Sequence, residues 1–279
     1  MKKILLFILM LVLGTVSFAE NIVITSIQPL YSLTSYLTKG TDIKVYTPFG
    51  SDTSMTMSKE AIREEGFDLS VAKKAQAVVD IAKVWPEDVI YGKARMNKIN
   101  IVEIDASYPY DEKMTTIFFS DYSNGKVNPY IWTGSKNLVR MVNIISRDLI
   151  RLYPQNKAKI EKNVTKFTTD LLKLENEANE KLLSVDNASV ISLSENLQYF
   201  LNDMNIYAEY VDYDSITAEN VANLIKDKGT KVVISDRWLK KNVIKALKDA
   251  GGEFVIINTL DIPMDKDGKM DPEAILKAF

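Results

Sequence analysis

The sequence predicts an α/β fold with two lobes, each a mostly parallel sheet flanked by helices, joined by a long connecting helix. Three observations predict this fold. Short β-branched runs alternate with helical stretches early in the chain, the same alternation returns near its end, and a long helical pattern without glycine or proline separates the two. We therefore expect an N-terminal α/β lobe at 20–154, a connecting helix at 155–184 and a C-terminal α/β lobe at 185–279.

Residues 1–19 are typical of a secretory signal peptide. Lys2 and Lys3 precede the apolar run Ile4–Leu13, and Ser17-Phe18-Ala19 places small residues where a signal peptidase cleaves. The run is too short for a membrane span, which needs about 20 residues. We expect cleavage after Ala19 and a periplasmic protein. Because the chain has no cysteine, we do not expect a lipoprotein.

The N-terminal lobe is expected to contain four strands with helices between them. After the first strand, Pro29 stands where a helix begins, since proline is favoured in the first turn. Strands that alternate with helices pair in parallel through right-handed crossovers. The expected strands are Asn21–Ser26, Ile43–Tyr46, Ala77–Ile81 and Ile99–Ile104, and the expected helices are Leu30–Leu37 and about Ser58–Glu65.

Two helices are predicted in the middle of the chain. Ser135–Tyr153 forms the first, Pro154 interrupts it, and one helical pattern then continues over Gln155–Leu183. At 1.5 Å per residue the second helix is about 40 Å long, so we expect a rod joining two lobes rather than an isolated coiled coil. Apolar residues recur at steps of three and four on one face of this rod: Ile160, Val164, Phe167, Leu171, Leu174, Ala178 and Leu182.

The C-terminal lobe repeats the alternation of strands and helices. The expected strands are Ser189–Leu193, Ile206–Val211, Lys231–Ser235 and Phe254–Asn258, with helices at about Glu195–Asp203, Ala218–Lys228 and Lys240–Ala250. Asp271-Pro272 supplies a cap and a first-turn proline for a final helix that ends at Phe279.

The composition excludes several functions. The chain has 279 residues and neither cysteine nor histidine, which excludes disulfides, thiolate zinc sites and hydrolysis by Ser–His–Asp or Cys–His groups. A net charge of −2 argues against nucleic acid or an anionic membrane as the main partner. No spacing singles out a pair of carboxylates for acid–base catalysis, so we do not expect an enzyme.

Candidate binding residues follow predicted strands, because open parallel sheets bind ligands beyond the carboxyl ends of their strands and two-lobed proteins bind between lobes. The segments are Gly50–Ser54, Asn128–Trp132, Ser194–Asn196 and Asp236–Trp238. Each has a structural alternative. Ser192 and Glu195 fit a capping box, and Asp236 fits a helix N-cap. Tyr130 and Trp132 fit half-buried packing residues. Four such segments together favour a shared cleft.

Several segments also carry a resemblance to a known family. They are Val23-Ile24-Thr25-Ser26 with Pro29-Leu30-Tyr31, Asn128-Pro129-Tyr130-Ile131-Trp132, Ser194 through Tyr199-Phe200-Leu201, and Thr217–Lys228 with Val232-Val233-Ile234-Ser235-Asp236. In this order they resemble the zinc and manganese periplasmic binding proteins, the metal-binding solute receptors of ABC importers. In that family the second segment is Asp-Pro-His-x-Trp and the third begins with histidine. The likeness covers essentially the whole mature chain.

The resemblance implies a periplasmic substrate-binding component that binds solute between two lobes and presents it to the membrane permease of an ABC importer. We expect a monomer. The family usually holds its metal with three histidines and one carboxylate. Those positions become Ser54, Tyr130, Ser194 and Asp236 here, and only the last keeps its chemistry.

This ligand set differs from that of a usual zinc site. Oxygen ligands suit calcium, magnesium or manganese rather than zinc. One carboxylate is too little charge for a tight divalent site unless Asp52 or Glu195 joins it. Tyr130 has to ionise from a pKa near 10, which needs a strong Lewis acid such as ferric iron. No cofactor is assigned beyond such an oxygen-ligated metal ion.

Two alternatives stay open. Tyr130, Trp132, Arg237 and Trp238 are also suited to stacking on and hydrogen-bonding an organic solute or a metal chelate. A protein of the same fold can also serve as a surface interaction protein without transporting anything.

Overall fold

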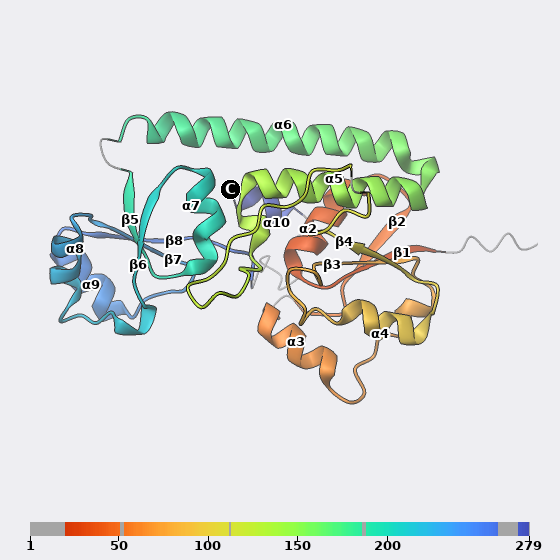
Figure 1. Cartoon of the computed structure of the whole chain (residues 1–279), viewed down its shortest axis with the longest axis horizontal. Helices are drawn as coiled ribbons and strands as arrows, with labels where there is room; N and C mark the ends of the chain where they lie inside the picture. Colours follow the sequence, from red (N-terminus) through yellow and green to blue (C-terminus); the bar gives the residue numbers. More distant parts are fainter. Residues whose placement is uncertain (1–19, 51–52, 112, 186–187, 262–272, 279) are drawn as a thin grey trace, which may run out of the picture.

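The computed structural model describes residues 20–50, 53–111, 113–185, 188–261 and 273–278, and contains two separate sheets of four parallel strands (Figure 1). The strands are β1 (Asn21–Thr25), β2 (Ile43–Tyr46), β3 (Ala77–Asp80), β4 (Val102–Asp105), β5 (Ser189–Ser192), β6 (Tyr207–Tyr210), β7 (Val232–Ser235) and β8 (Glu253–Ile256). The orders are β2-β1-β3-β4 and β6-β5-β7-β8. The predicted fold class is confirmed. The signal peptide, Asp52 and the Asp271-Pro272 cap lie outside the described residues.

The N-lobe consists of β1–β4 and the helices packed on both faces of that sheet. These helices are α2 (Gln28–Leu37), α3 (Met55–Arg63), α4 (Ile90–Asn97) and α5 (Ser135–Leu152), with the short turn η1 (Ser70–Lys73). Apolar residues of α2 and α5 form a core with one face, and those of α3 and α4 with the other. β3 is buried along its whole length, as expected for a central parallel strand.

Two N-lobe helices show how local sequence sets their first residues. Pro29 occupies the first turn of α2, as predicted. The helix expected at about Ser58–Glu65 is α3, and it begins at Met55. The Ser54 side chain caps it by accepting a hydrogen bond from the Met57 amide.

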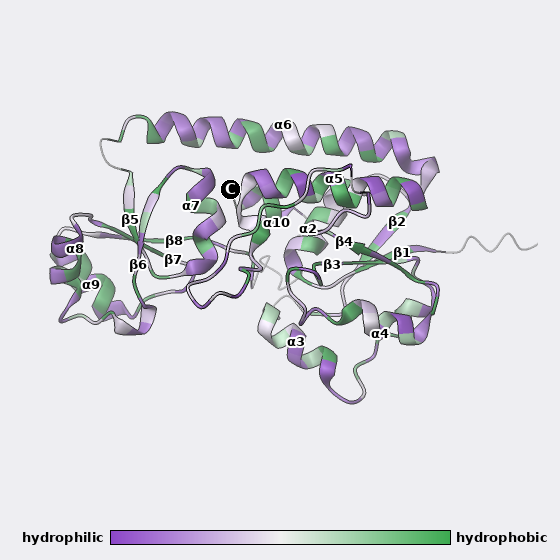
Figure 2. Ribbon diagram, in the orientation of Figure 1, coloured by the Kyte–Doolittle hydropathy of each residue, from purple (hydrophilic) through white to green (hydrophobic). Residues whose placement is uncertain are grey.

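The predicted rod is α6 (Lys157–Leu182), which follows the short turn η3 (Pro154–Asn156) and spans both lobes (Figure 1). Most of its surface is hydrophilic (Figure 2). The buried residues Ile160, Phe167 and Leu171 pack into the N-lobe core. The later residues of the predicted stripe, Leu174, Ala178 and Leu182, instead line a groove of about 280 Å³. The C-lobe residues Phe200, Met204 and Ile206 line the same groove. The apolar stripe is therefore shared between the lobes.

The C-lobe consists of β5–β8 with α7 (Gln198–Asp203), α8 (Val221–Lys228) and α9 (Lys241–Asp249). The last helix, α10 (Ala274–Lys277), crosses back: Ala274 and Ile275 lie in the N-lobe core, and the Ile275 amide donates to Ser32 Oγ at 3.0 Å. The last helix of the expected C-terminal lobe, 185–279, thus packs on the N-lobe, because the apolar face of α10 is buried against α2. The other lobe boundaries stay a prediction. Within the described chain, no helix has the length and apolar character of a membrane span.

Candidate functional site

The segment between β4 and α5 connects the N-lobe to the start of α7 through hydrogen bonds. The Ser120 amide donates to the Tyr199 hydroxyl at 3.0 Å, and that hydroxyl donates to the Asn128 carbonyl at 2.9 Å. Asn128 Nδ2 donates to the carbonyl of Glu195 at 2.8 Å, and the Ser123 amide donates to the Glu195 carboxylate at 3.0 Å. The Glu195 side chain, a predicted ligand, therefore holds this segment in place.

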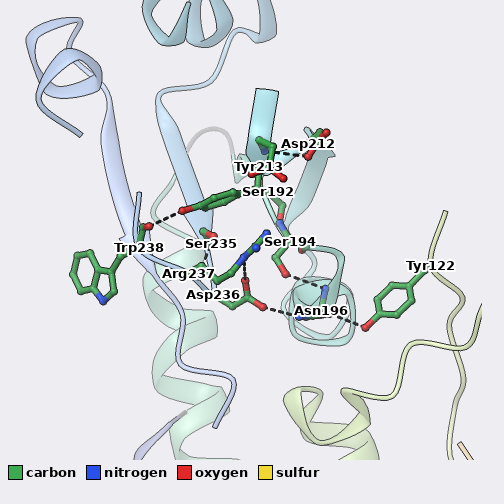
Figure 3. A network of polar contacts seen from close by, with 11 residues as sticks. Tyr122, Ser192, Ser194, Asn196, Asp212, Tyr213, Ser235, Asp236, Arg237 and Trp238 are labelled. Atoms are coloured by element: carbon green, nitrogen blue, oxygen red, sulfur yellow. Dashed lines mark hydrogen bonds and ion pairs between the residues drawn. The ribbon is translucent and has the colours of Figure 1, made fainter. Parts of the chain in front are cut away.

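Asp236 follows the carboxyl end of β7 and is the end of a chain of hydrogen bonds (Figure 3). Asn196, in the turn η4 (Glu195–Leu197), donates from Nδ2 to Asp236 Oδ2 at 2.7 Å, and the Tyr122 hydroxyl donates to Asn196 Oδ1 at 2.6 Å. Ser194 lies beside them, and its hydroxyl accepts from the Asn196 amide at 3.2 Å. We call this arrangement the Tyr122–Asn196–Asp236 chain. It links the segment before α5 to two strand ends of the C-lobe.

One oxygen of the Asp236 carboxylate has no hydrogen-bond partner. The side chain is only 7% exposed, and Oδ1 is buried and lies 4.0 Å from the Arg237 Nε. A buried carboxylate oxygen without a partner is costly, and it marks a position that a cation or a donor group of a ligand would satisfy.

Tyr130 and Asp261 complete the site from two other segments. Tyr130 precedes the turn η2 (Ile131–Thr133), and Asp261 follows β8 and accepts from the Met55 amide at 2.9 Å. Burial raises the pKa of Asp261, the charge of Asp236 adds to this, and hydrogen bonds from Met55 and Tyr130 oppose it. Burial, followed by the charge of Asp261, raises the pKa of the Tyr130 hydroxyl above its usual range. The charges of both carboxylates therefore act on the Tyr130 hydroxyl.

The remaining predicted residues lie in several places. Ser54 caps α3, so its side chain is engaged by that helix. Trp132 is 1% exposed and donates from Nε1 to the Thr259 carbonyl at 2.7 Å, which makes it a core residue that joins the lobes. Asp52 lies outside the described residues. The alternative that Asp236 caps a helix is wrong, because α9 begins at Lys241.

Arg237 and Trp238 form the outer rim of the site on the C-lobe. The Arg237 guanidinium stacks 4.1 Å from the centre of the Tyr213 ring, and the Tyr213 hydroxyl donates to the Trp238 carbonyl at 2.6 Å. The Trp238 side chain is 69% exposed and lies against Phe254, with 6.0 Å between ring centroids. A stacked cation beside an exposed aromatic face is suited to planar or anionic groups.

The side chains that could bind a ligand here offer oxygen atoms, apart from the Arg237 guanidinium, which offers only nitrogen, and the Asn196 amide, which offers both. They comprise two carboxylates, two phenols with raised pKa values and one side-chain amide: Asp236, Asp261, Tyr122, Tyr130 and Asn196. In the described part of the chain, no three carboxylate, histidine or cysteine side chains are grouped so as to hold a metal ion. The arrangement suits a hard cation that brings further oxygen ligands, or a polar molecule, and does not suit zinc.

Three residues of this site were not predicted as ligands. Asn196 lies within a segment that the sequence singled out, but its neighbours Ser194 and Glu195 were chosen as ligands. Asp261 lies just beyond the predicted strand Phe254–Asn258. Ligands bind beyond the carboxyl ends of such strands, so this residue could have been included among the candidates. Tyr122 lies in an irregular segment that carries no periodic signal.

Curated relatives are metal-transport proteins. The chain is 25% identical over 197 residues to the metal ABC transporter substrate-binding lipoprotein SsaB of Streptococcus sanguinis, covering 70% of this chain and 59% of that protein. It is 24% identical over 198 residues to the manganese ABC transporter substrate-binding lipoprotein scaA of Streptococcus gordonii, again covering 70% and 59%. The matched region thus spans about three-fifths of each relative's length.

A solved structure and a family match extend the likeness to nearly the whole chain. The Zn(II)-bound ZnuA-like domain of Streptococcus pneumoniae AdcA shares the fold with a TM-score of 0.69 and 17% identity, over 92% of this chain and 95% of that one. Residues 23–270 match the family described as ZnuA, zinc-uptake complex component A, periplasmic. The chain therefore belongs to the ZnuA family.

Proposed function

We propose that this chain is the periplasmic substrate-binding component of an ABC-type import system, and that its cargo is a metal ion or a metal chelate held between the lobes. One observation carries the proposal: Asp261, which follows β8 of the C-lobe, accepts a hydrogen bond of 2.9 Å from the Met55 amide at the start of the N-lobe helix α3, and Tyr130 and the charge of Asp236 both act on Asp261. The family and the names of the relatives support it. The proposed partner is a membrane permease, and no catalytic activity is proposed.

The proposed cargo follows from the donor chemistry. Without histidine or cysteine, the chain offers only oxygen ligands and amides, which favour manganese, calcium or ferric iron over zinc. Two carboxylates, Asp236 and Asp261, supply the negative charge, and Asp236 Oδ1, which accepts no hydrogen bond and lies 4.0 Å from the Arg237 Nε, supplies a ligand position. Because burial raises the pKa of Tyr130, a bound ion has to displace its proton or use the neutral hydroxyl.

The proposed location differs in one respect from that of the relatives. SsaB and scaA are named lipoproteins, whereas this chain contains no cysteine that could carry the lipid. We therefore propose release into the periplasm after cleavage behind Ala19.

Purification without chelators, followed by elemental analysis and native mass spectrometry, tests the proposal. A ligand at one hundred times its dissociation constant adds about 2.7 kcal/mol to the free energy of unfolding, which thermal unfolding detects. We expect stabilisation by manganese or ferric citrate, weaker stabilisation by zinc, and loss of both effects in Asp236→Ala. Asp249→Ala, which removes an exposed carboxylate at the end of α9, is the control. An empty protein that no metal or chelate stabilises contradicts the proposal.

The rim favours a second candidate, a receptor for a small organic solute. Arg237 stacked on Tyr213 beside the exposed Trp238 resembles a platform for a planar anion. In that case Trp238→Ala weakens binding strongly, while Tyr130→Phe has little effect. For a bare ion the order of the two effects is reversed.

A further inference from the structure

A pair of buried carboxyl groups lies in the N-lobe, apart from the candidate site. Asp80 ends β3 and is 0% exposed, and Asp88 lies in the loop between β3 and α4 and is 3% exposed. Neither side-chain oxygen of Asp80 accepts a hydrogen bond of normal geometry, and the Ala82 amide nearby only partly opposes the rise in the pKa of this group. Asp88 Oδ2 accepts from the Ser26 hydroxyl and from the Ile81 amide, but its Oδ1 has no partner. Three buried carboxyl oxygens thus lack a hydrogen bond of normal geometry, and the Ala82 and Ile90 amides near the pair oppose the effect of burial only in part.

The surroundings of this pair are acidic. Asp105, at the end of β4, accepts hydrogen bonds from the Ser107 hydroxyl and from the Lys83 amide, and its charge acts on both Asp80 and Asp88. Glu103 adds a further negative charge.

The cations nearby act on the outer members of this group rather than on the buried pair. The charge of Lys83 lowers the pKa of Asp105 and of Glu103, and Arg95 acts on Glu103. Burial, together with the charge of Asp88, raises the pKa of Asp80 well above its usual range, and burial raises the pKa of Asp88 to about 7.

Two ionised carboxylates buried this deeply need compensation, either from a metal cation or from a proton. A calcium ion takes six to eight oxygen ligands. The described residues provide no set of three acidic side chains arranged to hold a metal. A proton needs only one oxygen, and it removes the cost of burying a second charge.

We propose that Asp80 and Asp88 form a proton-binding site in which Asp80 is kept as a neutral carboxylic acid beside Asp88. The pair lies under the loop at 81–89. That loop is tied to α3 by an ion pair of 2.7 Å between Glu87 and Lys59, and the first residue of α3, Met55, contacts Asp261. Loss of the proton at alkaline pH places a second negative charge beneath this loop. The added charge destabilises the loop and its attachment to α3 at the carboxyl ends of the N-lobe strands. This inference does not depend on the proposed function.

The sign of the pH effect follows from linkage. A carboxyl group whose pKa is raised in the folded protein binds its proton more tightly there than in the unfolded chain, so stability is greatest at acid pH and falls as pH rises towards the folded pKa. For one proton, the unfolding constant rises about tenfold per pH unit between about pH 4 and that folded value. Asp80→Asn mimics the neutral acid and removes this dependence.

Urea unfolding of the full chain from pH 5 to pH 8.5 tests the inference. We expect the ratio of the wild-type unfolding constant to that of Asp80→Asn to rise at least tenfold from pH 5 to pH 7, with Asp80→Asn the more stable at pH 8. Asp249→Asn, an exposed carboxylate on α9 that pairs with Lys245, should follow the wild type. Equal pH dependence of wild type and Asp80→Asn overturns the inference.

Two further measurements keep the test decisive. Should Asp80→Asn fail to fold, the side-chain carboxyl carbon resonance assigned to Asp80 in labelled wild-type protein reports its titration directly: protonation that persists above pH 6 supports the pair, and an Asp80 already ionised at pH 6 overturns it. Calcium, magnesium or sodium that stabilises the wild type at pH 8 but not Asp88→Asn overturns it, because the pair is then a metal site.

Discussion

Replacing Asn196 by leucine tests the Tyr122–Asn196–Asp236 chain directly. Leucine has a similar volume but neither donates nor accepts a hydrogen bond. The change removes the 2.7 Å bond to Asp236 Oδ2 and the 2.6 Å bond from Tyr122. Asp236 is then a largely buried carboxylate with no hydrogen-bond partner, since its Oδ1 already lacks one. Arg237 is too exposed to compensate for the loss.

The magnitude follows from these bonds. A hydrogen bond to a charged group contributes about 1.5–3 kcal/mol, and the neutral bond from Tyr122 about 1 kcal/mol. We expect Asn196→Leu to lower the free energy of unfolding by about 3 kcal/mol, which for a chain of this size lowers Tm by about 6–12 °C. Urea unfolding followed by tryptophan fluorescence measures it. Asn223→Leu, at an exposed position of α8, is the control and should change stability by less than about 0.5 kcal/mol.

A double-mutant cycle with Asp236→Asn separates this explanation from simple repacking. If the cost of Asn196→Leu comes from the unpartnered charge, Asp236→Asn removes most of it, and the two changes are non-additive by at least about 1.5 kcal/mol. Additive effects, or a cost of Asn196→Leu below about 0.5 kcal/mol, would refute the reasoning.

Other predictions test the junction of the lobes and the site. Gly134→Ala places a Cβ 2.9 Å from the Tyr199 Cβ and should cost about 1–3 kcal/mol in urea unfolding, whereas Gly92→Ala in α4 meets open space and should stabilise by up to about 1 kcal/mol; equal effects would contradict the close approach. Trp132→Phe loses a 2.7 Å hydrogen bond to a backbone carbonyl and part of a fully buried ring, so calorimetry should show a loss of about 2–4 kcal/mol. Tyr130→Phe should leave the apo protein folded but reduce stabilisation by ferric citrate in a thermal shift assay; an unchanged shift would exclude the phenol as a ligand.

Much of the fold was predictable because buried parallel strands and amphipathic helices leave strong periodic signals. The stripe of Ile160, Phe167 and Leu171 predicted the rod and the face that it buries. The strand order within each sheet was not predictable, since sequence spacing does not say which strand lies beside which. The return of α10 to the N-lobe was also missed, because its apolar residues fit either core.

The candidate site was predictable where it depends on strand ends and not where it depends on irregular segments. Tyr130, Ser194 and Asp236 were named; Ser194 and Asp236 both hydrogen-bond to Asn196, and the charge of Asp236 acts on the Tyr130 hydroxyl. Tyr122 lies in a segment without periodicity, so nothing in the sequence indicated that its hydroxyl reaches Asn196. Asp80 ends an apolar strand, where an exposed carboxylate is common, and only the folded structure shows that it is buried.

Anomalous diffraction at the absorption edge of manganese or iron, from crystals of the metal-loaded protein, tests the central claim most directly. We expect one strong peak between the lobes, with Tyr130, Asp236 and Asp261 as its protein oxygen ligands. A peak on another surface, or saturating metal with no peak between the lobes, contradicts it.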